Sequence, residues 1–293
     1  MRRAAVPTTP ISLYATRSTG CRMNAACHLI EGRMKDAGVP DTIETLDFRM
    51  DAGLGARATI GLVVLQSDQT IEFEFARLVR GDGVAVYHAR IPNAMEVTPD
   101  TLRQMERDLP KTVALLPEAY GFDAIGYGCT SGATMIGEER VDTVIRRYHP
   151  SAKTSNPISA CKAAFTALGV NRIALVTPYA PSVTLEMQNN LVKSGFDITA
   201  VASFNQSSDL IVARITAESI LQAVLKIGAL NDCDGVFVSC TSLRALEIIA
   251  DAEAALGKPV VSSNQALAWH LMRLSGLTDT AVGAGRLFDL TQS

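Results

Sequence analysis

Apolar runs alternate with amphipathic segments along the chain from about residue 59 onwards. Apolar runs bounded by polar or glycine residues predict strands at 59–65, 84–91, 122–127, 172–176, 197–202, 235–239 and 259–262. Helical spacing of apolar positions predicts helices at 71–80, 100–116, 132–148, 157–168, 181–194, 209–227, 242–256 and 264–274. Regular alternation of the two elements is typical of an α/β fold with mostly parallel sheets.

The pattern occurs in two rounds of similar order. Each round has a strand with a polar loop, a second strand, and a third strand that ends in Cys-Thr-Ser, at Cys129 and at Cys240. We therefore expect two pseudo-symmetric, doubly wound (Rossmann-like) parallel-sheet domains with the active site in the cleft between them. Residues 57–153 with 265–293 should form the first domain, and residues 154–264 the second.

Residues 1–56 lack this pattern and are predicted to be a poorly ordered N-terminal extension. The acidic residues Glu31, Asp36 and Asp41, and the absence of an apolar stretch, do not fit a cleaved signal. The rest of the chain has no apolar run of about 18 residues, so no membrane-spanning helix is expected.

Composition narrows the possible partners. With 47% hydrophobic residues and a formal charge of −3, the chain can build a large core but has no electrostatic affinity for nucleic acid or an anionic membrane.

Four of the six cysteines lie in apolar patterns, which indicates free thiols in a reducing cytoplasm. No C-x-x-C spacing occurs and there are four histidines, so no metal site is expected. We expect a small-molecule substrate and a homo-oligomer.

Cys129 and Cys240 each follow a predicted buried strand, where α/β sheets place their chemistry. A helix that starts at such a cysteine would lower the pKa of its thiol. One thiolate could then take a proton from carbon while the opposite thiol delivers one, or one thiolate could add to an activated alkene. The alternative is that both cysteines are small buried packing residues.

The residues after the two thiols are candidates for binding an anion. The hydroxyl and backbone N–H groups of Thr130, Ser131, Thr241 and Ser242 could hold a carboxylate or a developing enolate, or could cap helices instead.

Three further candidates follow other strands. Ser67 and Asp68 lie in the loop after the first strand, where Asp68 could also be a turn or cap residue. Tyr179 follows a strand in Thr-Pro-Tyr, and its phenol could donate to a bound carboxylate or pack in the core.

Several motifs together resemble the maleate isomerase and arylmalonate decarboxylase branch of the Asp/Glu racemase superfamily over residues 58–277. The matching segments are 61–64, 67–72, 128–131, 177–179, 239–241 and 259–266. The Cys-Thr-Ser-Gly version is most similar to the arylmalonate-decarboxylase-like proteins of ectoine utilisation. The resemblance implies a two-domain fold without metal or organic cofactor, and Cys129 with Cys240 as the catalytic pair. It also implies that Tyr179 and the Thr130/Ser131 region hold a substrate carboxylate.

The sequence departs from this branch at informative positions. Arylmalonate decarboxylases keep only the second cysteine, whereas this chain has both. Maleate isomerases carry Asn where this chain has Asp68, and a second Asn at the position that aligns with Asp209. A carboxylate repels a substrate carboxylate and attracts a substrate ammonium group.

We therefore hypothesise a cofactor-independent two-cysteine isomerase or racemase that acts on a small, amino-acid-like carboxylate. The alternatives are a maleate cis–trans isomerase, an arylmalonate-type decarboxylase, or a two-lobed ligand-binding protein without catalysis.

Overall fold

The computed structural model describes residues 44–230 and 232–290. Most of the predicted extension, residues 1–43, lies outside the described residues. Residues 44–57 contain no helix or strand, and most of their side chains are exposed. The described residues from Met50 onwards form one compact unit.

The first half of this unit is built around a four-stranded parallel sheet with the order β2-β1-β3-β4. Its strands are β1 (Ala58–Leu65), β2 (Val84–Ile91), β3 (Ala124–Gly128) and β4 (Lys153–Ser155). Its helices are α1 (Ile71–Leu78), α2 (Pro99–Val113), the 3-10 turn η2 (Glu118–Tyr120), α3 (Thr130–Ile136) and α4 (Glu138–Tyr148). β1 and β3 are buried along their whole length, which explains their continuous apolar sequences.

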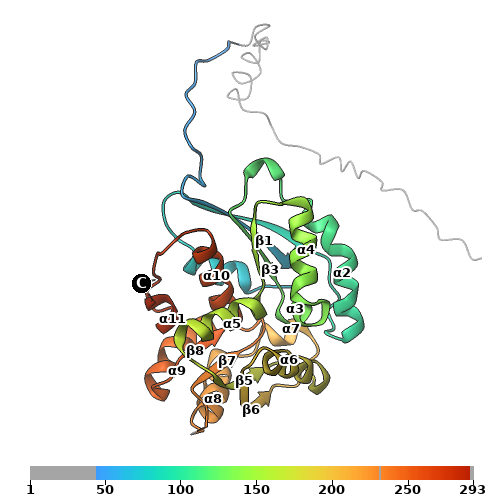
Figure 1. Cartoon of the computed structure of the whole chain (residues 1–293), viewed down its shortest axis with the longest axis vertical. Coiled ribbons are helices and arrows are strands. Elements are labelled where there is room, and N and C mark those ends of the chain that lie inside the picture. The colour runs from blue at the N-terminus through green and yellow to red at the C-terminus, as the bar shows by residue number, and fades with distance from the viewer. Residues whose placement is uncertain (1–43, 231, 291–293) are drawn as a thin grey trace, which may run out of the picture. The chain divides into compact units, whose positions relative to one another are not determined.

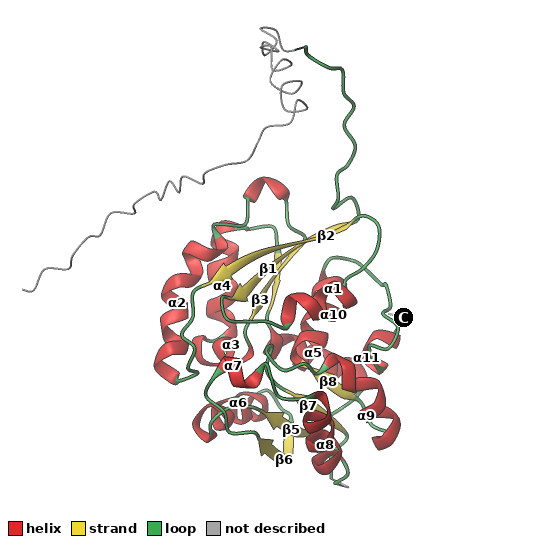
Figure 2. Ribbon diagram, turned by 180° about the vertical axis from the view of Figure 1, so that it is seen from behind, coloured by secondary structure: helices red, strands yellow, loops and turns green. Residues whose placement is uncertain are grey.

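The second half repeats this arrangement with the order β6-β5-β7-β8, again all parallel. Its strands are β5 (Arg172–Thr177), β6 (Asp197–Ser203), β7 (Gly235–Val238) and β8 (Val260–Ser262). Its helices are α5 (Pro157–Leu168), α6 (Pro181–Lys193), α7 (Asp209–Val212), α8 (Ala217–Gly228), the 3-10 turn η3 (Leu246–Ile248) and α9 (Ile249–Leu256). Helices α10 (Ser263–Leu274) and α11 (Arg286–Asp289) complete the chain, and Figures 1 and 2 show the two lobes. The predicted pair of pseudo-symmetric parallel-sheet domains is confirmed.

Two helices cross from one lobe to the other. Helix α5 follows β4 but packs on the second sheet, where Phe165 meets Phe237 of β7 edge to face. Helix α10 follows β8 but packs on the first sheet, where Leu271 lies against Gly126 of β3. Helices α5 and α10 also pack on each other (Figure 1). We propose on this basis that residues 57–153 with 265–293, and residues 154–264, form the two domains.

Two predicted helices are divided in the structure, and a third begins later than predicted. The helix at 132–148 is split into α3 and α4 by Gly137, whose φ of 96° interrupts the helical backbone. The helix at 209–227 is split into α7 and α8, because Thr216 caps a new helix through its side chain. The segment after Cys240 forms turns, and regular helix begins only at η3 and α9. The short strand β4 and helix α11 were not predicted.

Within residues 44–230 and 232–290, no helix is long and apolar enough to cross a membrane. The same residues contain no group of three or more His, Cys, Asp or Glu side chains that could hold a metal ion.

Glu74 of α1 is a buried carboxylate at the junction of the two lobes. It accepts hydrogen bonds from the backbone N–H of Leu246 at 3.0 Å and from the side-chain amide of Asn264 at 2.8 Å. Burial raises the pKa of Glu74 to about 7, although these two donors and Arg77 oppose the rise.

This raised pKa gives a pH-dependent term in stability. Because native Glu74 holds its proton at higher pH than in the unfolded chain, native protein binds more protons between about pH 4.5 and 7. Its contribution is therefore present below this window and is lost as pH rises through it. Relative to Glu74→Gln, the unfolding free energy of the wild type should fall by about 3 kcal/mol from pH 4.5 to 7.5. Urea unfolding across this range measures the difference, and parallel pH curves for the two proteins would contradict it.

Candidate active site

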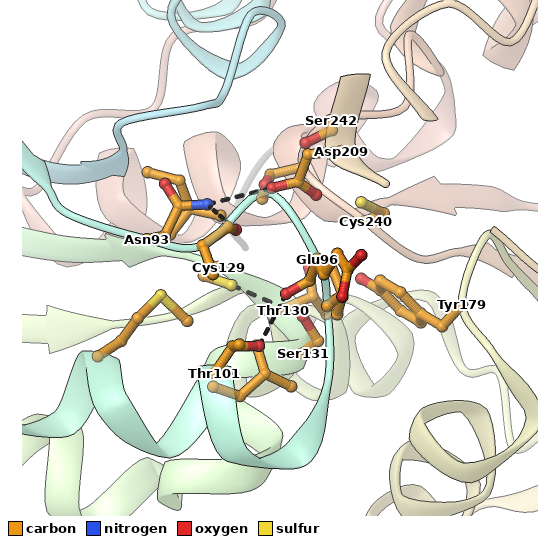
Figure 3. Close-up of a pocket in the computed structure, with 16 residues that line it drawn as sticks. Asn93, Glu96, Thr101, Cys129, Thr130, Ser131, Tyr179, Asp209, Cys240 and Ser242 are labelled. Carbon is orange, nitrogen blue, oxygen red and sulfur yellow. Dashed lines mark hydrogen bonds between the residues drawn. The ribbon is translucent and has the colours of Figure 1, made fainter. Parts of the chain in front are cut away.

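One pocket lies between the carboxyl ends of the strands of both sheets (Figure 3). Its lining residues come from both lobes: Leu65, Asn93, Ala94, Glu96, Val97, Thr101, Leu102, Met105, Cys129, Thr130, Ser131, Tyr179, Asp209, Cys240, Thr241 and Ser242. Its volume is about 370 Å³. The pocket therefore suits a small ligand.

Cys129 lies at the start of α3, as predicted. Its backbone is extended with φ −146°, and its Sγ accepts a hydrogen bond from the backbone N–H of Gly132 at 3.2 Å. The Ser131 hydroxyl lies 3.7 Å from the same sulfur. The thiol is thus the N-cap group of α3, and both contacts favour its thiolate.

Cys240 is held differently, which corrects the expectation of a helix start at both cysteines. Its φ is 121°, a strained value for a residue with a side chain. Its backbone N–H donates to the Ser263 hydroxyl at 2.9 Å. The Tyr179 hydroxyl and the Ser242 backbone N–H face the thiol and favour its ionisation. Tyr179 is therefore beside the second thiol as well as in the pocket lining.

Both thiols are neutral at pH 7. Burial raises the pKa of Cys129 and of Cys240 to about 12, and the carboxylates of Asp209 and Asp68 raise both further. The expectation that helix ends lower these pKa values is wrong, because desolvation outweighs the few N–H contacts. The groups around the two thiols therefore favour the protonated form of each.

Asp209 brings a carboxylate to the pocket wall. Its Oδ2 accepts hydrogen bonds from the Ser67 hydroxyl at 2.6 Å and from the Asn93 amide at 3.2 Å. Its pKa is raised, first by burial and then by Asp68. Ser67 does not line the pocket, and its contact with the site is the hydrogen bond that it donates to Asp209.

Asp68 lies behind the lining residues. Its Oδ1 accepts from the backbone N–H groups of Thr70 and Ile71, at 2.7 and 2.8 Å, so one oxygen serves as a cap for α1. Its Oδ2 is buried without a hydrogen-bond partner. Burial raises the pKa of Asp68 against these two N–H contacts.

The structure brings the four residues after the thiols together as predicted. Thr130, Ser131, Thr241 and Ser242 all line the pocket. Among the described residues, no acceptor is found for the backbone N–H of Thr130, Ser131 or Thr241. The Thr130 hydroxyl instead donates to Ser263 at 2.8 Å, which ties the two cysteine loops together. Free N–H groups beside both thiols can receive a substrate carboxylate.

Three functional positions were not predicted. Asn93 and Glu96 follow β2, and their place at the carboxyl end of a strand was a usable signal. The third is Ser263 at the start of α10, whose hydroxyl accepts from both Thr130 and Cys240. Glu96 also forms an isolated antiparallel bridge with Ser208, which no local pattern indicates.

Gly132 leaves the space that the first thiol occupies. A Cβ at this position would lie 2.9 Å from the Cys129 Sγ and 2.6 Å from the Tyr127 hydroxyl. Gly132→Ala should therefore displace the thiol and weaken its N–H contact, so that alkylation of Cys129 changes at least threefold at pH 9. Gly228→Ala is the matched control, because its Cβ meets Leu256 at 2.6 Å outside the pocket lining. Equal alkylation rates in Gly132→Ala and wild type would show that the sulfur is not confined by Gly132.

Comparisons with known proteins agree with this architecture. Residues 100–288 match the model of the arylmalonate decarboxylase family. A maleate isomerase from Nocardia farcinica is 28% identical over 78% of this chain and 94% of its own length. The arylmalonate decarboxylase of Bordetella bronchiseptica is 38% identical over 42% of this chain and 52% of its own length.

A solved structure shows the same fold. The Nocardia farcinica maleate cis–trans isomerase, in a cysteine-to-serine mutant with a covalently bound succinylcysteine intermediate, superposes with a TM-score of 0.74 at 25% identity. The superposition covers 79% of this chain and 98% of that one. Because the family model covers well over half of the sequence, this chain belongs to the arylmalonate decarboxylase family, in the branch of the Asp/Glu racemase superfamily that includes the maleate isomerases.

Proposed function

We propose that this protein is a cofactor-independent isomerase that uses Cys129 and Cys240 as an acid–base pair on a small carboxylate with an amino or other cationic group. The observation that carries the proposal is the charge of the pocket. Two thiols from different lobes share it with Asp209 and Glu96, and no lysine, arginine or histidine lines it in the described part of the chain.

The charges favour a substrate with one carboxylate. Asp209 and the nearby Asp68 place negative potential beside the thiols and raise their pKa values. At about 4 Å and an effective dielectric near 20, one opposite-charge contact is worth of order 4 kcal/mol before desolvation. A dicarboxylate would meet repulsion of the same size, whereas an ammonium group would be attracted.

A single substrate carboxylate has its own place in the pocket. The unpaired backbone N–H groups of Thr130, Ser131 and Thr241 lie in its lining, with the Tyr179 hydroxyl beside Cys240. Preorganised donors of this kind stabilise a carboxylate, and they stabilise it more when it becomes an enolate. We infer that the carboxylate binds at these donors and the cationic group binds toward Asp209.

The reaction then needs two proton transfers. One thiolate removes the proton from the carbon next to the carboxylate, and the electron pair of the C–H bond moves into the enolate. The opposite thiol delivers its proton to the other face of this carbon, and the electron pair returns to form the new C–H bond. The configuration is inverted, and the two sulfurs have exchanged protonation states.

The raised thiol pKa values fit this substrate class. Burial keeps both thiols neutral at pH 7, and Asp209 adds to this effect. A substrate ammonium group beside Asp209 would offset its charge and favour a thiolate. Binding of the proper substrate would thus activate the base, and an uncharged or anionic ligand would not.

The second candidate is maleate isomerisation, in which one thiolate adds to the double bond. The covalent succinylcysteine of the Nocardia enzyme supports this chemistry in that protein. Asp209, where maleate isomerases carry Asn, speaks against a dicarboxylate here. Decarboxylation of an arylmalonate is a weaker alternative, because this chain has both cysteines.

The cellular setting is also a proposal. All four cysteines in the described ranges are free thiols, which suits catalysis in a reducing cytoplasm. An amino-acid-like substrate would suit a role in ectoine utilisation, for which the Cys-Thr-Ser-Gly resemblance is the support. Exposed apolar side chains on β6 and α7, among them Val201 and Ile211, would suit a homo-oligomer.

Deuterium exchange at carbon tests the acid–base pair. In D₂O, the wild type should exchange the α-proton of at least one compound in a panel of small amino acids and N-substituted amino acids, with inversion. Cys129→Ser and Cys240→Ser should each lose at least 100-fold in inversion while remaining folded, because a hydroxyl is too weak an acid to supply the base. Wild-type rates in both variants would show that the cysteines are packing residues.

A charge change tests the substrate class. Asp209→Asn should weaken kcat/KM for the amino-acid-like substrate by about tenfold, which corresponds to a third of the contact energy above. The same change should improve turnover of maleate. Glu247→Gln, an exposed carboxyl outside the pocket lining, is the control and should change both rates by less than threefold. Efficient maleate turnover by the wild type, unchanged in Asp209→Asn, would favour the maleate isomerase alternative.

A further inference from the structure

The loop that carries Cys240 is fixed from behind by side chains of other segments. Residues 240–245 form turns and irregular backbone before η3 begins at Leu246, so helical hydrogen bonds do not hold them. The Ser242 carbonyl accepts from the Thr70 hydroxyl at 2.8 Å, and the Thr241 carbonyl accepts from the Asn264 amide at 2.8 Å. The Leu246 N–H donates to Glu74 at 3.0 Å. These contacts must maintain the strained backbone of Cys240.

Glu74 has a central place among these contacts. One oxygen of its carboxylate receives the Leu246 N–H, and the other receives the Asn264 amide nitrogen at 2.8 Å. That same nitrogen donates to the Thr241 carbonyl. With both protons of the amide directed to acceptors, the Asn264 side chain has one favourable orientation. Glu74 therefore orients the NH₂ group of Asn264 toward the carbonyl of Thr241, the residue directly after Cys240.

The carboxylate at this position has a cost that packing alone does not explain. Glu74 is 3% exposed, and its neighbouring charges are Asp68, which raises its pKa, and Arg77, which lowers it. Burying a carboxylate is unfavourable unless hydrogen bonds to its oxygens offset the loss of solvation. The Asn264 Oδ1 is itself buried without a hydrogen-bond partner. The amide therefore makes both contacts of its NH₂ group and leaves its oxygen unpaired.

A second buried glutamate provides a comparison within the same fold. Glu253 of α9 is 5% exposed and also binds two donors, the backbone N–H groups of Val260 at 3.0 Å and Arg286 at 2.8 Å. Neither donor belongs to the pocket lining or to the Cys240 loop. Glu253 thus has the burial and bonding of Glu74 without its connection to a thiol.

We propose that Glu74 is a positioning residue for Cys240: through Asn264 and Leu246 it fixes the 240–246 loop and so the direction of the second thiol. The proposal rests on the proposed function for the catalytic role of Cys240. Glu74 does not line the pocket, so its loss should affect the orientation of the thiol more than the binding of substrate.

The test compares Glu74→Gln with Glu253→Gln. Glutamine keeps the size of the side chain and can still accept from Leu246, but it presents an NH₂ group to the NH₂ group of Asn264. Glutamine has a single acceptor oxygen, so it can serve either Leu246 or Asn264 but not both. Either the Leu246 contact is lost, or the Asn264 amide is displaced or flipped and its contact with the Thr241 carbonyl is weakened. Asn264→Ala removes the same contact from the other side and replaces Glu74→Gln if that variant does not fold.

Two readouts separate positioning from general stability. Iodoacetamide alkylation, followed by mass spectrometry of the cysteine peptides, reports access to each thiol. In Glu74→Gln, Cys240 should be alkylated at least fivefold faster than in the wild type. The reason is that a loosened loop exposes the Cys240 side chain, which is 7% exposed in the native structure. The alkylation rate of Cys129 should stay within twofold of the wild-type rate. Turnover should show kcat at least tenfold lower with KM within threefold. Glu253→Gln should match the wild type in both.

Specific results would overturn the proposal. A folded Glu74→Gln with wild-type kcat does so, and so does a Glu253→Gln that shows the same losses. If the wild type turns over no compound of the panel, the proposed function fails, and the alkylation rates still decide whether Glu74 positions Cys240. Wild-type alkylation of Cys240 in a folded Glu74→Gln would then reject the proposal.

Discussion

The protonation state of two buried thiols is the constraint on which the rest of the site depends. Burial raises the pKa of Cys129 and of Cys240 to about 12, and nearby carboxylates add to the effect. An enzyme that needs one thiolate must therefore obtain the stabilising charge from elsewhere. The pocket lining supplies N–H donors and hydroxyls but, within the described residues, no cationic side chain. The proposed substrate, which carries its own positive charge, would satisfy this constraint.

The two halves of the molecule give the thiols similar positions but different surroundings. Both follow the third strand of a four-stranded parallel sheet with the same order. Cys129 caps a helix and receives the Gly132 N–H, whereas Cys240 lies on a strained backbone beside Tyr179. Pseudo-symmetry therefore brings two like groups to one pocket, and under the proposed mechanism the local differences would let one act as base and the other as acid.

Much of this architecture was predictable, because buried parallel strands have a clear sequence pattern. The strands around Cys129 and Cys240 and the helices at 157–168 and 181–194 follow from apolar runs, a Pro start and a glycine end. The breaks at Gly137 and before Thr216 were missed, since a left-handed glycine or a mid-helix cap looks the same as an ordinary helical position in a single sequence.

The electrostatics of the site could not be predicted from local pattern. The sequence places helix starts near both thiols, but the depth of burial, which decides the sign of a pKa shift, is a tertiary property. Glu74 similarly appears in an amphipathic helix pattern, yet it is buried because α1 packs against α10 and the Cys240 loop. Asp68 was expected to contact substrate, and the structure uses one of its oxygens as a cap while the other is buried without a partner.

The central claim is that the two thiols act on opposite faces of one carbon. A crystal structure with a bound α-amino carboxylate tests it most directly, because it shows the position of each sulfur relative to the reacting carbon. The account predicts Sγ atoms roughly 6–10 Å apart, about two near-attack distances plus the carbon between them, with the ammonium group beside Asp209. A ligand bound with both sulfurs on the same face of its α-carbon, or with its carboxylate beside Asp209, would contradict it.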